Sequence, residues 1–577
     1  MPLANSFELS KKKGREAYIQ PIIEGKKIRY EIKYGTNAPE PPKIARGKFK
    51  CISCNSPVDL NYIREESKAK RMGVRMLAIV AEGRNGRLYI SPNEEHNQSA
   101  NVDKPRHYPS GILSGKATVN VGVYGFEETG DLFTNRQLTA LTTFSDLIAE
   151  AQKKATEDAV AASMHNDLVP LSEGGTGATA YGQAVGVYLA FLIDKLADLC
   201  NSLNRWEPNA QCPRQLFARQ AIPMIWDFAE GNPFSTSSGS WSVLLRNLMG
   251  CFNSDTFAFI RDRCGFVRQF DAQSDNGMCQ IIVSTDPPYY DNISYADLSD
   301  FFYVWMRNCL KDVYPKLFRT MLTPKAEELV ATPYRFAGSV EKAQNFFEGG
   351  MLKTFRQVYI YAREDIPVTI YYAFKQSESD EDKANGTQTA STGWETMLTA
   401  IIQAGFCITG TWPMRTECIS RSISQGTNAL ASSIVLVCRK RPADAPTCTR
   451  RDFINALKRE LKPALQKLQA SNIAPVDMAQ SAIGPGMGVY SRYSKVLEAD
   501  GTPMSVRSAL QIINQELDLY FTEQDGELDR DSRFCVDLYT QYAFNDVKFV
   551  RPTYWREQRI PPWRNWPDGA YCMRKKA

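Results

Sequence analysis

The segment that most constrains this chain is Ser284–Tyr290, in which an acid, two prolines and two tyrosines come directly after an apolar run. That run, Gln280–Val283, is short, rich in β-branched residues and closed by the prolines, so it predicts a buried strand ending at the motif. Open α/β sheets bind their ligands at the carboxyl ends of the strands. The sequence therefore predicts an α/β fold with Asp286 at the ligand-binding edge of a sheet.

The residue types of this motif suit the methylation of an exocyclic amine. Such an amine is a poor nucleophile because its lone pair is delocalised into the ring. The Asp286 carboxylate and the Pro287 carbonyl would each accept one amine hydrogen, which turns the lone pair toward a methyl donor. Pro288 would shape the turn and Tyr289 would stack on an extruded base. The alternative is an ordinary proline turn after a core strand.

The composition indicates an intracellular enzyme of several domains. The 577 residues are 43% hydrophobic, which is enough for more than one core. The net charge of +5 is small, so a nucleic-acid surface would have to come from local clusters of basic residues. The fourteen cysteines form no disulfide-like pattern and no apolar run is long enough to span a bilayer, which predicts a cytoplasmic protein. Only three histidines occur, which argues against histidine-based hydrolysis.

The pattern of residues divides the chain into four regions. Residues 1–110 are basic and β-rich. Residues 111–250 are helical and could serve target recognition, and Thr134–Gln137 could cap the first turn of a helix there. Residues 251–442 alternate strands and helices, with predicted strands Val368–Phe374, Cys407–Trp412 and Ser433–Val437 and a helix closed by Gly405. This alternation predicts a catalytic core with a mainly parallel sheet and an antiparallel hairpin at its edge. Residues 443–577 are helical and end in a tail with eight basic and two acidic residues from Lys548 to Lys576. Its interleaved aromatic residues suit nucleic-acid binding. The alternative is that its prolines and tryptophans pack the tail against the rest of the protein.

One cysteine pair, Cys51 and Cys54, has the spacing of half a zinc knuckle. A structural zinc ion needs four ligands, and no second pair with this spacing follows. The pair is therefore either half of a site or two free thiols.

Two further segments resemble functional loops without matching them. Glu173–Gly177 is glycine-rich, but it lacks the Lys-Ser/Thr ending and the preceding strand of a phosphate loop, so a flexible helix connection is favoured. Asp227–Trp241 could be a loop near the active site or a plain turn between helices.

The segments Asp286–Tyr303, Trp412–Glu417 and Ser6–Gly14 together resemble the large prokaryotic adenine-specific DNA methylases that carry an uncharacterised N-terminal domain. The resemblance covers most of residues 1–442. It implies a Rossmann-like methyltransferase sheet, S-adenosyl-L-methionine as cofactor, double-stranded DNA as partner and adenine N6 as target. The motif chemistry alone serves cytosine N4 equally well. By analogy, such an enzyme acts in restriction-modification or phage defence.

The resemblance also assigns roles to single residues. Asp286, Pro287, Pro288 and Tyr289 match the catalytic motif of the family. Asp271 ends a predicted strand, Phe266–Ala272, and lies fifteen residues before Asp286. It matches the acid that accepts hydrogen bonds from the cofactor's adenine amine.

The chain departs from the family in one respect. Family members carry, upstream of the matched region, a glycine-rich loop that holds the methionine end of the cofactor, and we find none here after a strand. We therefore expect the later portion of a split enzyme, whose upstream protein partner carries that loop and a second cysteine pair. The alternatives are a circularly permuted enzyme and a non-catalytic nucleic-acid-binding subunit derived from a methyltransferase.

Overall fold

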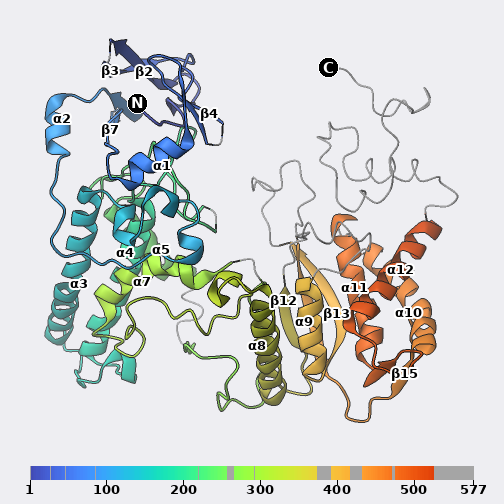
Figure 1. The fold of residues 1–577 in the computed structure, drawn as a ribbon. Coiled ribbons are helices and arrows are strands. Elements are labelled where there is room, and N and C mark those ends of the chain that lie inside the picture. Colours follow the sequence, from blue (N-terminus) through green and yellow to red (C-terminus); the bar gives the residue numbers. More distant parts are fainter. Residues whose placement is uncertain are drawn as a thin grey trace, which may run out of the picture. The chain divides into compact units, whose positions relative to one another are not determined.

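The computed structural model describes residues 2–524 apart from 26, 46, 85, 219, 256–264, 291–292, 373–391, 416–431 and 471–474 (Figure 1). The chain forms a mixed α/β structure with two compact units. The first, here called the N-terminal unit, contains residues 1–269 and 294–328, and the second, the C-terminal unit, contains residues 270–293 and 329–577. The predicted motif thus belongs to the C-terminal unit, while the residues that follow it return to the N-terminal unit.

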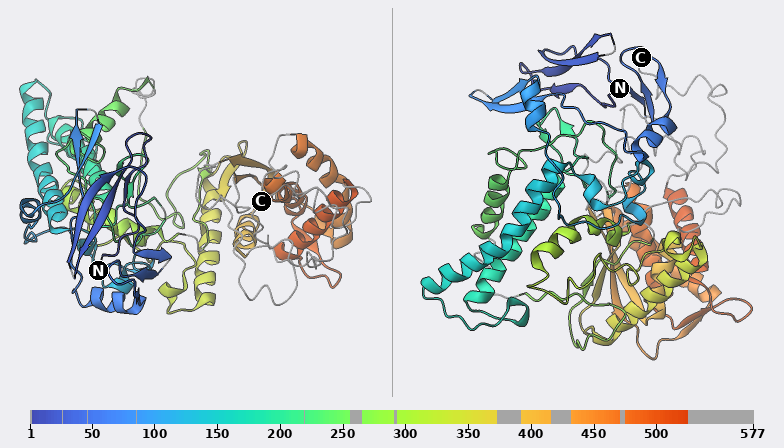
Figure 2. Two further views of the ribbon diagram at one scale, coloured as in Figure 1. Left: turned by 90° about the horizontal axis from the view of Figure 1, so that it is seen from above. Right: turned by 60° about the vertical axis from the view of Figure 1, so that its left-hand side comes forward.

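The N-terminal unit begins with short antiparallel strands, as the alternating pattern predicts. Strands β2 and β3 form a long hairpin, and β1 pairs with β2 (Figure 2). Two smaller sheets, β4–β5–β6 and β7–β8, follow. The bounds are β1 Glu8–Ser10, β2 Ala17–Glu24, β3 Lys27–Tyr34, β4 Lys43–Ala45, β5 Lys48–Lys50, β6 Pro57–Val58, β7 Ile79–Gly83, β8 Gly86–Ile90, β9 Trp206–Glu207 and β10 Cys212–Pro213.

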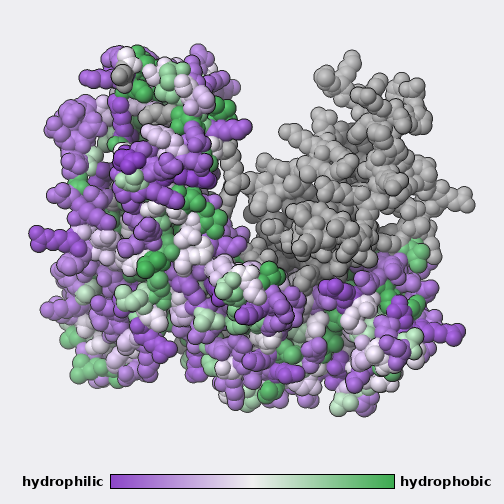
Figure 3. All heavy atoms as spheres, viewed as in Figure 1, coloured by the Kyte–Doolittle hydropathy of each residue, from purple (hydrophilic) through white to green (hydrophobic). Residues whose placement is uncertain are grey.

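Three long helices, α3, α4 and α7, form much of the rest of this unit in its described residues. Helix α3 (Asn135–Ala161) begins at Thr134, whose hydroxyl accepts from the Gln137 N–H in a reciprocal capping box, as the sequence predicts. Helix α4 (Ala178–Leu199) lies beside α3, and α7 (Tyr295–Leu310) packs on both (Figure 1). The shorter helices are α1 Leu60–Lys68, α2 Glu94–Ser99 and α5 Trp241–Phe252. On the face shown in Figure 3, hydrophilic side chains predominate over the described part of the surface.

Helix α7 carries a buried ion pair. The Asp300 carboxylate, with no exposed side-chain surface, lies 2.7 Å from the Lys325 ammonium and accepts from the Thr323 N–H at 2.9 Å. On the same helix, Asp297 accepts from the Lys116 N–H at 3.0 Å. Both acids belong to the segment after the Asp-Pro-Pro-Tyr motif, and they tie the segments 115–117 and 323–325 to the helix.

The C-terminal unit contains a four-stranded sheet in the order β11-β12-β14-β13. Strand β11 runs parallel to β12, and β14 is antiparallel to both β12 and β13. Strands β11, β12 and β13 therefore share one direction and β14 opposes them. The bounds are β11 Ser284–Thr285, β12 Val368–Tyr372, β13 Phe406–Arg415 and β14 Ser432–Lys440.

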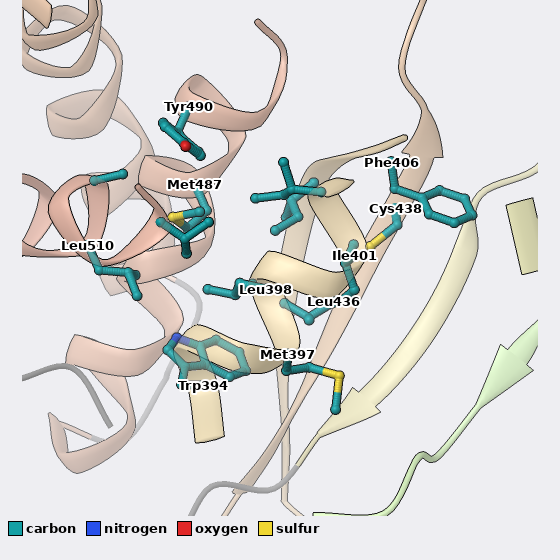
Figure 4. Packing of buried hydrophobic residues seen from close by; sticks show 14 of the residues in the cluster. Trp394, Met397, Leu398, Ile401, Phe406, Leu436, Cys438, Met487, Tyr490 and Leu510 are labelled. Carbon is teal, nitrogen blue, oxygen red and sulfur yellow. The ribbon is translucent and has the colours of Figure 1, made fainter. Parts of the chain in front are cut away.

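Helices cover this sheet and share one apolar core with it. Figure 4 shows Leu398 and Ile401 of α9 beside Leu436 of β14, with Met487 and Leu510 from two later helices nearby. Gly405 closes α9 with a φ of +102°, as the sequence predicts. The elements are α8 Val340–Tyr361, α9 Thr392–Gln403, β15 Thr447–Thr449, α10 Arg450–Ala470, α11 Pro475–Ser491, β16 Lys495–Leu497 and α12 Val506–Gln524. No helix among the described residues combines the length and the hydropathy needed to cross a membrane.

The sequence predictions for this sheet are confirmed in part. The final two strands form the predicted antiparallel pair. The prediction of a mainly parallel sheet is wrong for the described residues, since β11 and β12 are its one parallel pair. A large parallel sheet is not present in the part of the chain that the structure describes.

Two predicted strands are also wrong. Residues 266–270 have no regular structure, and Phe266 and Val267 are 93% and 98% exposed. Gln280–Val283 contributes a single bridge, from Ile281 to Ala362, and β11 occupies the next two residues. A strand forms only where a neighbour completes its hydrogen-bond ladder. Within the described residues β11 is the edge of the sheet, so Gln280–Val283 has no neighbour on that side, and residues 266–270 pair with none of the described strands.

We predict that Asp300→Ala lowers the free energy of unfolding of the N-terminal unit by about 3 kcal/mol, because it removes the carboxylate from a buried ion pair. Urea unfolding measures this loss, with the buried Trp305 on the same helix as fluorescent reporter. The control is Asp158→Ala on α3 of the same unit, which breaks an exposed pair with Lys154 and should cost less than about 1 kcal/mol. Equal losses in the two variants would contradict a structural role for the Asp300 pair.

Candidate functional site

The Asp-Pro-Pro-Tyr motif lies at the carboxyl end of β11. The Thr369 N–H of β12 donates to the Val283 carbonyl at 3.1 Å, which joins the two parallel strands just before the motif. Asp286 is exposed and Pro287 is buried. The carboxylate therefore faces solvent while the next residue anchors the turn in the protein.

The side chain of Tyr289 turns back toward the acid. Its hydroxyl donates to Asp286 Oδ1 at 2.9 Å, so one carboxylate oxygen is held in place by the ring that follows it. The sequence predicts a stacking role for this ring but gives no sign of the hydroxyl contact, because it depends on the backbone turn at the two prolines. One oxygen of Asp286 is thus oriented from within the motif.

Aromatic residues from other elements surround the motif. The Tyr289 ring meets that of Tyr372, at the carboxyl end of β12, edge-on at 5.4 Å. Tyr372 in turn stacks on Trp394 of α9 at 5.5 Å, and its hydroxyl donates to the Gly393 carbonyl at 3.2 Å. A side chain at Gly393 would come within 3.2 Å of that hydroxyl. The motif therefore borders a pair of stacked rings, Tyr372 and Trp394, here called the aromatic wall. The sequence does not predict this contact, although it correctly predicts the strand that ends at Tyr372.

The residue after the motif is held in a strained conformation. Tyr290 has a φ of +32°, which a non-glycine residue rarely adopts. Its carbonyl accepts from the Ala331 N–H at 2.9 Å, and its ring packs on Phe347 of α8 at 5.2 Å. These two contacts fix the carboxyl side of the turn, as Pro287 fixes its amino side.

Asp271, the predicted cofactor contact, lies in an exposed turn instead of at a strand end. Its carboxylate accepts from the Gln273 N–H at 3.0 Å and from the Ser274 hydroxyl at 3.2 Å. The strand that was predicted to carry it does not form. Its contact with the cofactor adenine stays a prediction.

The cysteine pair lies in the turn between β5 and β6. The Cys51 N–H donates to the Ser56 carbonyl and the Asn55 N–H to the Cys51 carbonyl, which closes a tight turn around both thiols. The side-chain and backbone hydrogen bonds of Ser56 lower the pKa of the exposed Cys54 thiol, and Cys51 lowers it further. Among the described residues, no group of three or more acids, histidines and cysteines could hold a metal ion. The pair is compatible with half a zinc site.

The two glycine-rich or polar loops have structural roles. In the segment Glu173–Gly177, the Thr176 N–H donates to the Asp167 carboxylate at 3.2 Å, so a side chain already fills the place of an anion. This confirms a connection between helices. Asp227 accepts from the Asn5 and Ser6 N–H groups, and Ser240 caps α5, so the segment 227–241 anchors the N-terminus and starts a helix.

Of the other segment that carries the family resemblance, Trp412–Glu417, the described side chains Trp412 and Met414 are exposed near the carboxyl end of β13. The basic tail Lys548–Lys576 lies outside the described residues.

Comparison with protein-family models, with curated proteins and with solved structures finds no match to this chain.

We predict that iodoacetamide alkylates Cys54 more slowly in a Ser56→Ala variant than in the parent at neutral pH. Without the serine hydroxyl the pKa of Cys54 rises, so less of the thiol is ionised and able to react. Mass spectrometry of the peptide that contains Cys54 measures the rate. Well above the ordinary thiol pKa of about 8.5, both proteins should react alike. A rate difference that persists there would point to steric access instead of ionisation.

Proposed function

We propose that this protein is an S-adenosyl-L-methionine-dependent DNA amino-methyltransferase that flips its target base, with adenine N6 as the favoured acceptor. The observation that carries the proposal is the exposed Asp286 carboxylate at the carboxyl end of a parallel strand, oriented by the Tyr289 hydroxyl at 2.9 Å. A carboxylate in this position can accept an amine hydrogen from a base that enters from solvent. Adenine is favoured over cytosine by the sequence resemblance alone.

The arrangement of the sheet supports this proposal. Three strands share one direction and the last strand, β14, runs against them between β12 and β13. This order agrees with one half of a Rossmann-like methyltransferase sheet. The motif follows the strand at the edge of that half, where ligands of open α/β sheets bind.

The cofactor would find only part of its site in the described residues. The motif offers the base end, and Asp271 offers an acid in an exposed turn. In the part of the chain that the structure describes, no glycine-rich turn follows a strand of the four-stranded sheet. We propose that a second protein holds the methionine end of the cofactor, as in the split enzyme that the sequence predicts.

The rival function is a nucleic-acid-binding subunit without catalysis. The exposed Asp286 carboxylate does not favour it, because an acid repels the phosphates that a nucleic-acid-binding surface attracts. Titration calorimetry with S-adenosyl-L-methionine separates the two. Cofactor binding by the chain together with the product of the adjacent upstream gene favours the enzyme, and no binding in either preparation favours the rival.

We predict that Asp286→Ala abolishes methyl transfer while DNA affinity stays within a few-fold of the parent. The carboxylate orients the amine but makes no contact with phosphate, which dominates affinity. The assay follows labelled methyl groups from the cofactor into unmethylated double-stranded DNA, with the upstream protein present. Asp444→Ala, an exposed acid of the same unit, is the matched control and should keep full activity. Methylation that survives in Asp286→Ala would contradict the assignment.

We predict that the hydroxyl and the ring of Tyr289 contribute differently to kcat/KM. Tyr289→Phe keeps the ring but loses the bond to Asp286, so kcat/KM should fall by no more than about tenfold, the effect of one hydrogen bond. Tyr289→Ala also loses the stacking surface, so we expect a loss of about a hundredfold or more. Steady-state kinetics of the same methylation assay measure both. Equal losses would show that the hydroxyl, and not the ring, is the group that matters.

A further inference from the structure

Within the part of the chain that the structure describes, strand β11 has one unpaired edge, directly beside the proposed catalytic motif. The Arg363 N–H donates to the Ile281 carbonyl at 3.0 Å and the Thr369 N–H to the Val283 carbonyl at 3.1 Å, so both carbonyls face the sheet. Because backbone groups alternate along an extended chain, those of Ile282 and Ser284 point the opposite way. Among the described residues no strand lies on that side.

One face of the same segment is also uncovered. Val283 is buried in the core, whereas the next side chains on either side of it, Ile282 and Ser284, are exposed. Ile282 leaves 64% of its surface in solvent, and Met278 just before it leaves 46%. Parallel strands are normally covered on both faces. Among the described residues, this parallel pair has an open edge, and the exposed Ile282 lies beside it.

The preceding residues show the same lack of a partner. Gln280–Val283 has the composition of a buried strand but forms one bridge on one side. Phe270, at the start of the unit, is 47% exposed. Strands depend on their neighbours more than helices do, so a neighbouring strand would extend β11 backward through this segment.

We propose that this open edge is the docking site of a separate α/β polypeptide, which adds a parallel strand to β11 and packs apolar side chains over Ile282. The inference rests on the proposed function, because the occupant is taken to be the protein that supplies the glycine-rich cofactor turn. A strand that pairs with Ile282 and Ser284 ends beside Asp286. Its following turn would therefore arrive at the same edge of the sheet, where the methyl donor is needed.

The test blocks the edge without changing the core. Ser284→Pro removes an outward N–H and adds a ring at a position where an edge strand tolerates proline. Ser284→Ala is the matched control, since it changes the side chain and keeps the N–H. The probe is the polypeptide encoded directly upstream, and its affinity for each full-length chain is measured by titration calorimetry. Circular dichroism and thermal melting verify that each variant is folded.

We expect Ser284→Pro to weaken this complex at least about tenfold and Ser284→Ala to change it less than about twofold. Ile282→Lys should weaken it similarly, whereas Val340→Lys, an equally exposed residue at the far end of α8, should not. Hydrogen exchange should slow at residues 281–285 when the complex forms. Equal affinity of the proline and alanine variants, or no complex with the parent chain, would overturn the proposal.

Two further outcomes separate this proposal from the methyltransferase assignment. A complex that depends on Ser284 but transfers no methyl group would retain the docking site and reject the enzyme. Efficient methylation by the chain alone would retain the enzyme and reject the docked partner. Sedimentation of the chain alone shows whether it self-associates. If it does, and Ser284→Pro abolishes the self-association, the edge is occupied by a second copy of this chain and the proposed partner is rejected.

Discussion

The pairing of β11 with β12 is the interaction on which the candidate site depends. Only two residues form the strand, and the hydrogen bond from the Thr369 N–H to the Val283 carbonyl joins it to β12 at its amino end. From that point Pro287 turns inward, Tyr290 is held by Ala331, and Asp286 is left in solvent with Tyr289 bonded to it. A shift of this pairing by one residue would exchange the buried and exposed side chains and bury the acid.

The parts of the structure that the sequence predicts well are those that local interactions decide. Helix α3 begins where Thr134 and Gln137 cap each other, and α9 ends at Gly405, whose positive φ suits glycine. The sequence predicts strands β12, β13 and β14 correctly because they are apolar over most of their length, and the structure buries them in one core. In each case the residues that define the element lie within it or next to it.

The failed predictions concern relations between distant segments. Phe266–Ala272 and Gln280–Val283 have the composition of strands, but a strand needs a neighbour, and the sequence of one segment does not reveal whether the neighbour is present. The aromatic wall was missed for a similar reason. Tyr372 and Trp394 come from a strand and a helix on either side of residues 373–391, and they meet Tyr289 only because the chain folds them together.

The geometry of the motif and the open edge of β11 together bear on how base recognition and methyl transfer are divided between proteins. Asp286 is already oriented in the single chain, since Tyr289, Pro287 and Tyr290 belong to the same short turn and need no other protein. A cofactor held from one side only would lose much of its binding energy, because the cost of ordering it stays the same while fewer groups contact it. On the two proposals together, base recognition is built into this chain and methyl transfer depends on assembly. On these proposals, the oriented carboxylate would act only once the partner had brought the methyl donor to it.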